Sequence, residues 1–446
     1  MAVLAVGGCR FLQTQGMVTM VKNIFVMALD EFNREMLERL QGADEMRFHS
    51  LLDMETAVDT RYYDIPLLLD RARLQLREFP GSIDAIVGFW DFPTSTMQPI
   101  LRREFGLRGP SLESVLRCEH KYWFRVNEAQ FAPEQTPAYA AVDPFDERYP
   151  EHVPLDYPFW IKPVRSHSSQ LGFYIGDYAS FADALGEIRQ DIHFLARPFN
   201  ELLAYAEIPD AIKAVDGWHC IAEEIISAGR QCTLEGYILN GEVVIYGTVD
   251  SMREGIYGSS FSRYQYPSDL PEGVKADMCE MASDFIRQIE FDNSPFNIEF
   301  YYEPASGQVW MLEVNARCSK SHSLLFEMVD GTSNKQAMVD VALGRKPVFP
   351  EGGGDFSVAA KFMLREHDDA FVRRVPTDEE IAAIEADMPG CRIQIVAVEG
   401  RRLAQLLHQD SYSYETALLF IGGDSVEEVE DKSRRVKARL HFELER

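Results

Sequence analysis

The most informative residues in this chain are two carboxylates that are predicted to face each other across a β-hairpin. The segment reads FNIEFYYEPASGQVWMLEVNARCS over residues 296–319. If residues 304–308 form the loop, a normal length for a hairpin, strand pairing places Glu299 opposite Glu313. The same register pairs the neighbours: Asn297 with Asn315, Ile298 with Val314, Phe300 with Leu312, and Tyr302 with Trp310. The apolar pairs then form one buried face, and the acids and amides share the other.

Two ionised carboxylates in this position repel each other. Opposed side chains lie roughly 4.5–5.5 Å apart at Cβ, and unit charges about 4 Å apart repel by about 4 kcal/mol at an effective dielectric constant near 20. A bound cation removes that repulsion. Glu299, Glu313 and the amide of Asn315 offer only oxygen ligands, which favour Mg²⁺ (or Mn²⁺) with phosphates completing the shell. The alternative interpretation is a solvated strand face with incidental acids.

The composition is that of a large acidic globular protein. The chain has 446 residues, enough for about three domains, and a formal net charge of −27. This charge disfavours nucleic acid or an anionic membrane as a partner, and no stretch approaches the roughly 20 apolar residues that span a bilayer. The seven cysteines lack C-x-x-C spacing, so we expect reduced thiols in a cytoplasmic protein. The oligomeric state stays open, a homodimer included.

Strand and helix patterns predict the organisation of the chain. The N-terminal part alternates strands with helices, which indicates a parallel sheet with crossover helices, and it lacks the G-x-G-x-x-G motif of a dinucleotide site. One helix is expected over residues 111–127 and a proline-rich loop over residues 131–158. The expected parts are an extension over residues 1–19, an α/β domain over 20–115, a central domain over 116–350 with a lid at about 155–215, and a C-terminal α/β domain over 351–446.

Two lysines and one loop have the chemistry to hold a polyphosphate. Lys162 ends the predicted strand FWIKPV, and the loop RSHSSQLG after it contains Ser168 and Ser169. The lysine supplies a point charge, and backbone N–H groups of the loop can approach phosphate oxygens. An ordinary surface Lys-Pro explains the same residues, and Lys121 in CEHKYWF is by itself a solvated lysine on a helix. The backbone of residues 223–226 could read a base edge, with a plain hairpin as the alternative.

Taken in order, five motifs resemble those of the ATP-grasp superfamily, in its branch of carboxylate–amine (amino-acid or dipeptide) ligases. They are GLRGPSLESVLRCEHKYWFR, FWIKPV…SSQLGF, AEEII…CTLEGYIL, FNIEF and MLEVNAR. The resemblance covers roughly residues 106–346, and the E-x-N-x-R match at residues 313–317 is its sharpest element. It implies an α/β (α+β) fold with a Rossmann-like N-terminal domain, a lid, a central antiparallel sheet and a small C-terminal α/β domain.

The resemblance also implies a role for each matching residue. It assigns ATP phosphates to Lys121, Lys162, Ser168 and Ser169, adenine to Glu223, Glu224 and Ile226, Mg²⁺ to Glu299, Glu313 and Asn315, and stabilisation of the reacting phosphoryl group to Arg317. At the ribose position the chain departs from the pattern, because Gln231 replaces a carboxylate and bonds a hydroxyl more weakly. Arg253 and Arg263 lie where relatives contact substrate, with surface ion pairs as the alternative.

The reaction implied by the resemblance activates a carboxylate with ATP. An acyl phosphate forms, ADP leaves, and an amine attacks the carbonyl to give an amide and phosphate. A carboxylase of the biotin-dependent type is one alternative, although the chain has no M-K-M biotin acceptor. A non-catalytic ATP-binding scaffold is the other. Small-molecule acids and amines are therefore the expected partners.

Overall fold

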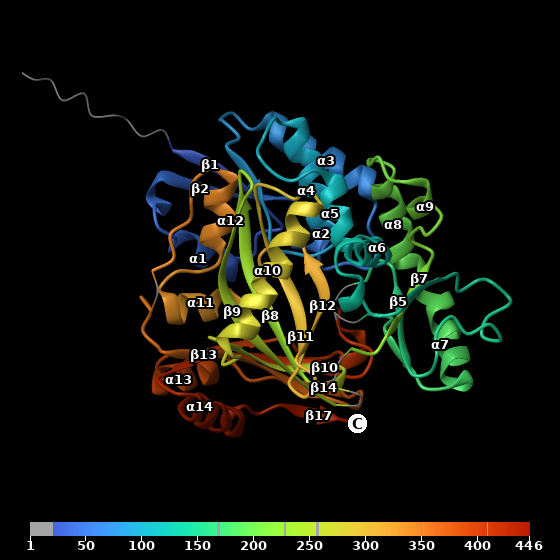
Figure 1. Cartoon of the computed structure of the whole chain (residues 1–446). Coiled ribbons are helices and arrows are strands. Elements are labelled where there is room, and N and C mark those ends of the chain that lie inside the picture. The colour runs from blue at the N-terminus through green and yellow to red at the C-terminus, as the bar shows by residue number, and fades with distance from the viewer. Residues whose placement is uncertain (1–20, 167–169, 227–228, 256–257, 351, 408) are drawn as a thin grey trace, which may run out of the picture.

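The structure is a computed structural model of the whole chain, and it describes residues 21–166, 170–226, 229–255, 258–350, 352–407 and 409–446. Among the described residues the strands form four sheets, with helices packed around them (Figure 1). Residues of the four-stranded and eight-stranded sheets and of the loop after the third strand line one central space. Within the described residues, no helix has both the length and the apolar character that crossing a bilayer requires.

The N-terminal part confirms the predicted alternation of strands and helices. Its three strands pair in parallel in the order β2-β1-β3. The acid side chains of Asp30, Asp53 and Asp64 cap three of its helices by accepting backbone N–H bonds. The elements are β1 (Lys22–Met27), α1 (Glu31–Glu38), η1 (Ala43–Glu45), β2 (Met46–Leu51), α2 (Met54–Ala57), α3 (Ile65–Glu78), β3 (Ala85–Val87) and α4 (Thr94–Glu104).

Two helices, not one, connect this part to the rest of the chain. The single helix expected over residues 111–127 is wrong, because α5 (Leu112–Glu119) ends at His120 and α6 (Lys121–Phe131) begins directly after it. His120 has an extended backbone, and its ring accepts the N–H of Trp123 as the cap of the second helix. The predicted cap of the first helix, Ser111, is confirmed. The break places Lys121 at the start of a helix, where its side chain reaches the central space.

A four-stranded antiparallel sheet covers one side of the central space, in the order β4-β7-β5-β6. The loop expected over residues 131–158 contains a strand, β4, that sequence reasoning missed, since the strand has only four residues and lies between Pro137 and Pro144. Strands β4 and β7 lie outside residues 155–215 but pair in the same sheet as β5. The elements are η2 (Pro133–Gln135), β4 (Tyr139–Val142), β5 (Phe159–Pro163), β6 (Phe173–Ile175), α7 (Tyr178–Asp191), α8 (His193–Leu203), α9 (Asp210–Lys213) and β7 (Cys220–Glu224).

The largest sheet is antiparallel and has eight strands in the order β12-β11-β8-β9-β10-β13-β16-β15. Alternate residues of β11 face opposite sides of the sheet: Phe296, Ile298 and Phe300 belong to one buried apolar cluster with Phe285 of α10, and Glu299 faces the central space. The elements are β8 (Arg230–Leu239), β9 (Glu242–Glu254), β10 (Ser260–Tyr266), α10 (Glu272–Gln288), β11 (Ser294–Glu303), β12 (Gln308–Asn315), η4 (Lys320–His322), α11 (Ser323–Asp330) and α12 (Lys335–Ala342).

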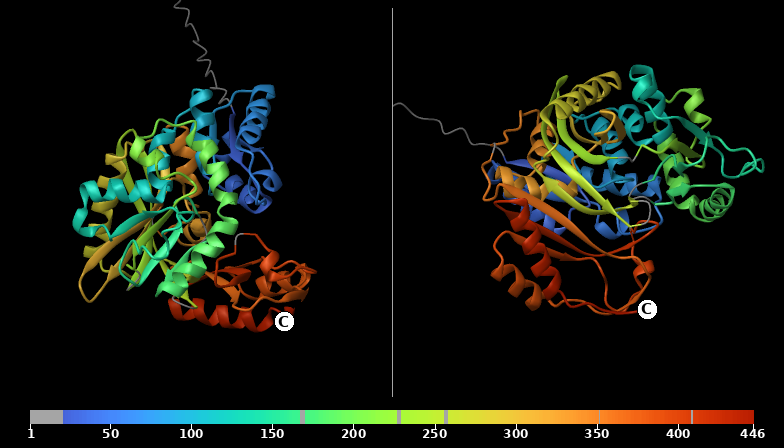
Figure 2. Two further views of the ribbon diagram at one scale, coloured as in Figure 1. Left: turned by 90° about the vertical axis from the view of Figure 1, so that its right-hand side faces the viewer. Right: turned by 60° about the horizontal axis from the view of Figure 1, so that its bottom comes forward.

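The C-terminal residues extend this sheet. Strand β13 pairs with β10, so β13, β15 and β16 continue the eight-stranded sheet (Figure 2, right-hand view). Only β14 and β17 pair apart from it. The elements are β13 (Val358–Glu366), β14 (Phe371–Arg374), α13 (Asp378–Asp387), β15 (Cys391–Ile395), η5 (Leu403–Gln405), β16 (Tyr414–Gly423), α14 (Val426–Arg439) and β17 (Glu443–Glu445).

The hairpin of β11 and β12 has the predicted register at one end only. Glu299 lies opposite Glu313 and Asn297 opposite Asn315, as predicted. Beyond Glu299 a bulge shifts the pairing, so the predicted pairs Phe300–Leu312 and Tyr302–Trp310 are wrong; Phe300 lies opposite Met311 and Tyr302 opposite Val309. At the bulge, backbone carbonyl groups need hydrogen-bond donors from outside the hairpin. The buried guanidinium of Arg125 donates to the carbonyls of Met311 (2.8 Å) and Leu312 (3.3 Å).

Candidate active site

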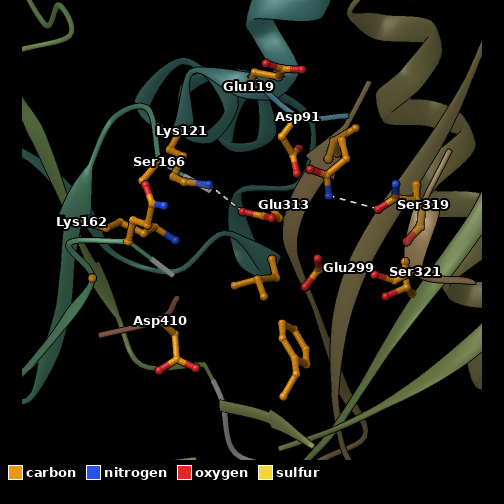
Figure 3. Close-up of a pocket in the computed structure, with 18 of the residues that line it drawn as sticks. Asp91, Glu119, Lys121, Lys162, Ser166, Glu299, Glu313, Ser319, Ser321 and Asp410 are labelled. Carbon is orange, nitrogen blue, oxygen red and sulfur yellow. Dashed lines mark hydrogen bonds and ion pairs between the residues drawn. The ribbon is translucent and has the colours of Figure 1, made fainter. Parts of the chain in front are cut away.

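The central space is a cavity of about 460 Å³. Residues of α5, α6, the four-stranded sheet, the β11–β12 hairpin and the C-terminal strands line it. In Figure 3, Lys121 and Lys162 lie on one side of the carboxylate pair and Ser319 and Ser321 on the other. The cavity therefore has two ends, separated by Glu299 and Glu313.

The pKa values of the two facing carboxyl groups are shifted in opposite directions. Burial and the charge of Glu313 raise the pKa of Glu299. Burial acts in the same direction on Glu313, but Lys121 and Lys162 outweigh it and hold the pKa of that carboxyl well below its usual range. The Lys121 Nζ lies 2.6 Å from Glu313 Oε2. One acid of the pair is thus neutralised by a lysine, while the other lacks a matching counter-charge.

Gln231 positions the less compensated acid. Its Nε2 donates to Glu299 Oε2 (2.7 Å), and its Oε1 accepts from Arg253 Nε (2.6 Å) and the Tyr301 hydroxyl (2.9 Å). The side chain is only 4% exposed and does not line the cavity. The predicted ribose contact therefore lacks support: the amide is already occupied by protein partners, and we assign it to orienting Glu299. Arg253 itself lines the cavity, as expected for a substrate contact.

Lys162 and Glu223 form a second buried ion pair. The Lys162 Nζ lies 2.5 Å from Glu223 Oε2, and Arg125 Nε lies 2.7 Å from Glu223 Oε1. Burial would raise the pKa of Glu223, but the two cations lower it to about 2. Burial lowers the pKa of Lys162 and Glu223 opposes that effect. This carboxylate therefore holds the lysine beside the cavity, and its side chain is committed to that pair instead of facing a base.

Two further predicted nucleotide residues also belong to the cavity wall. Glu224 and Ile226 line it, and the backbone of Glu224 already bonds the carbonyl of Ala138 (2.9 Å). Ser168 and Ser169 lie outside the described residues. Ser166, just before them, is buried and lines the cavity.

Arg317 is held by an acid that sequence reasoning missed. Its Nη2 lies 2.7 and 2.8 Å from the two carboxylate oxygens of Asp91, and Nε lies 2.9 Å from Asp91 Oδ1. Burial acts to lower the pKa of Arg317, but Asp91 outweighs it and raises it. Asp91 follows the last parallel strand, β3, in FWDF. An acid just beyond the carboxyl end of a parallel strand is a usable signal for a site residue.

Arg263 lies outside the cavity, which contradicts its predicted substrate role. Its Nη1 lies 2.7 Å from Glu430 Oε1 of α14, and its guanidinium rests on the Phe362 ring. Strand β10 turns this side chain toward the C-terminal helices because β10 pairs with β13 in the extended sheet. Arg263 therefore links β10 to α14, and we expect no contact between its side chain and the substrate.

The donor set fits a metal that needs few protein ligands. Within the described part of the chain, no three His, Cys, Asp or Glu side chains gather as a complete protein site. Asn315 Nδ2 donates to Asn297 Oδ1 (3.0 Å), and no described residue donates to its Oδ1. Two carboxylates with one amide oxygen suit Mg²⁺, which keeps water and phosphate in its shell.

Comparisons with known proteins agree with this geometry. Residues 265–347 match the family described as carbamoyl-phosphate synthase L chain, ATP binding domain. No curated protein matches the chain by sequence.

Solved structures match over nearly the whole chain. An L-amino acid ligase from Bacillus licheniformis is 16% identical with a TM-score of 0.72, covering 96% of this chain and 100% of its own. An N5-carboxyaminoimidazole ribonucleotide synthetase from Thermotoga maritima is 14% identical (TM-score 0.62, 95% and 99% covered). A biotin carboxylase from Campylobacter jejuni is 13% identical (TM-score 0.61, 96% and 93% covered). The chain therefore has the ATP-grasp fold.

Proposed function

We propose that the chain is an ATP-dependent ligase that joins a carboxylic acid to an amine through an acyl phosphate, releasing ADP and phosphate. One observation carries the proposal: the opposed acids Glu299 and Glu313 share an enclosed cavity with Lys121, Lys162 and Arg317. Cations on both sides of an acid pair provide places for a charged phosphate chain and its counter-ion.

The residues divide between holding ATP and stabilising the reacting group. Mg²⁺, or Mn²⁺, bound by Glu299, Glu313 and Asn315 would shield the phosphate charge when present. Lys121 and Lys162 exchange their carboxylate partners for phosphate oxygens. Arg317, fixed by Asp91, faces the charge that develops on the transferred phosphoryl group.

Each step balances. A carboxylate oxygen of the acid attacks the γ-phosphorus and ADP departs, which leaves an acyl phosphate. The free amine attacks the acyl carbon, phosphate departs with the C–O bond's electron pair, and the amine nitrogen loses its proton. The four-stranded sheet that carries Lys162 covers the nucleotide end, and we assign it the lid role because an acyl phosphate must be kept from water.

The remaining predicted nucleotide residues are assigned to adenine and to the outer phosphates of ATP. We assign adenine to the backbone near Glu223, Glu224 and Ile226, at the cavity wall. Ser168 and Ser169 belong to the loop after Lys162, to which we assign the outer phosphates.

Substrate-dependent ADP release tests this function. Purified protein with Mg-ATP is expected to release ADP and phosphate only when an acid and an amine from a panel of amino acids and dipeptides are both present. Lys121→Met should remove this activity, and Lys346→Met, an exposed lysine paired with Glu242, should retain it. Release driven by bicarbonate alone would instead indicate a carboxylase, and nucleotide binding without any turnover a scaffold.

A further inference from the structure

Two lysines at the second end of the cavity have no carboxylate partner. Lys320 lies on η4, three residues after Arg317, and Lys361 lies on β13; both line the cavity. Among the residues that the structure describes, neither ammonium group forms an ion pair with an acid. This end therefore differs from the nucleotide end, where Lys121 and Lys162 are each paired with a glutamate.

Both lysines are surrounded by aromatic rings and hydroxyls. The Lys320 Nζ lies 3.6 Å from the Trp90 ring centroid. The Lys361 Nζ donates to Ser321 Oγ (3.1 Å) and lies 5.8 Å from the Tyr264 ring centroid. Burial and the charge of Lys361 lower the pKa of Lys320 to about 7, and burial lowers the pKa of Lys361. Both ammonium groups are thus shielded from water, and Asp30 and Glu415 compensate them only from a distance, without a direct ion pair in the described ranges.

The acids nearest to them are engaged elsewhere. Arg365 Nη1 lies 2.8 Å from Asp410 Oδ2, and its Nη2 lies 3.3 Å from Glu415 Oε2. Asp30 accepts the backbone N–H of Asn33 (2.8 Å) as the cap of α1. The neighbouring Lys335 adds a further positive charge to this region. An anion entering the cavity here would meet an excess of positive charge.

We propose that Lys320 and Lys361 bind a carboxylate that the amine substrate carries in addition to its reacting amino group. This inference rests on the proposed function and narrows its amine substrate to anionic amines. The hydroxyl of Ser321 lies beside Lys361 and can donate to the same carboxylate.

Two considerations assign the carboxylate to the amine and not to the acid. The acid consumes its carboxylate at the phosphoryl group, whereas the lysine end lies beyond Glu299, on the side of Ser321 (Figure 3). An ammonium group must also lose its proton before it attacks, and nearby positive charge favours the neutral amine. The lysines can therefore hold one end of the amine substrate while easing deprotonation of the other.

Matched amines test the inference. The assay uses the best amino acid of the panel, its carboxamide, and hydroxylamine, a neutral amine that traps an acyl phosphate. Lys320→Met and Lys361→Met should each raise the KM of the amino acid at least tenfold, in line with losing one charged hydrogen bond. Turnover with the carboxamide and with hydroxylamine should stay within twofold. Methionine keeps the contacts with the aromatic rings, and Lys346→Met is the control for lost surface charge.

Two outcomes overturn the inference while the ligase function stands. An unchanged KM for the amino acid in the variants would show that the lysines do not bind the amine substrate. An equal loss of turnover with hydroxylamine would assign the lysines to binding of the acid or the nucleotide. If wild-type protein shows no turnover even with hydroxylamine, the proposed ligase function has failed. A binding measurement then tests the role of the two lysines independently of turnover. With Mg-ADP present, amino acids should then raise the unfolding temperature of wild type more than their carboxamides do. This difference should vanish in both variants. If wild type shows no such difference, or if the variants keep it, the inference is wrong.

Discussion

Replacing Arg317 by alanine is expected to lower kcat at least a hundredfold while nucleotide affinity stays within about threefold, as when one preorganised donor to a developing charge is lost. The guanidinium is buried and fixed by a bidentate bond to Asp91, so it needs no rearrangement as charge develops. Lys121 and Lys162 remain to hold the nucleotide. Steady-state kinetics and equilibrium binding of an ATP analogue measure the two effects separately.

A second arginine provides the matched control for this variant. Arg39 also forms a two-pronged bond with a carboxylate, that of Glu327, but outside the cavity and half exposed. Arg39→Ala should leave kcat near the wild-type value. Near-wild-type turnover in Arg317→Ala would remove the residue from the catalytic scheme, and equal losses in both variants would point to stability as the cause.

Replacing Glu299 by glutamine is expected to abolish turnover and, without ligands, to stabilise the fold. Burial and Glu313 raise the pKa of Glu299, so the folded state holds this proton more tightly than the unfolded state. Stability from this group is therefore present at low pH and is lost as pH rises from the ordinary glutamate value through the raised one. Glutamine removes that loss and can still accept the bond from Gln231. The expected gain at pH 8 is about 1–3 kcal/mol.

Denaturant unfolding between pH 5 and pH 8 measures this gain. The difference between wild type and Glu299→Gln should grow with pH, and saturating Mg-ATP should stabilise wild type more than the variant. Glu303→Gln, at the far end of the same strand and outside the cavity, should change neither quantity. A variant that is less stable than wild type at pH 8 would contradict the electrostatic account of the acid pair.

The acid pair was predictable because its cause is local. Alternation along β11 and β12 fixes which side chains share a face, so Glu299, Glu313 and Asn315 follow from the sequence alone. The predicted pairing fails at the very next residue, because a bulge inserts Leu312 without any sign in the residue pattern. Its stability depends on Arg125, which lies far away in the sequence and satisfies the displaced carbonyls.

The second end of the cavity was not predictable because its cause is long-range. The strand pattern of residues 351–446 indicates an α/β segment, but it cannot show that β13 pairs with β10 and turns Lys361 toward the hairpin. Asp91 and Arg317 likewise meet only through the packing of the N-terminal layer. Gln231 was assigned to ribose by its place in a motif, whereas its neighbours across the sheet give it Glu299 as a partner.

The most direct test of the account follows the oxygen of the acid substrate. The acid is labelled with ¹⁸O in its carboxylate, and the protein turns it over with Mg-ATP and the amine. If the carboxylate attacks the γ-phosphate, one ¹⁸O atom appears in the released phosphate for each amide formed. Amide formation with unlabelled phosphate, or with the label in AMP, would contradict the acyl-phosphate mechanism.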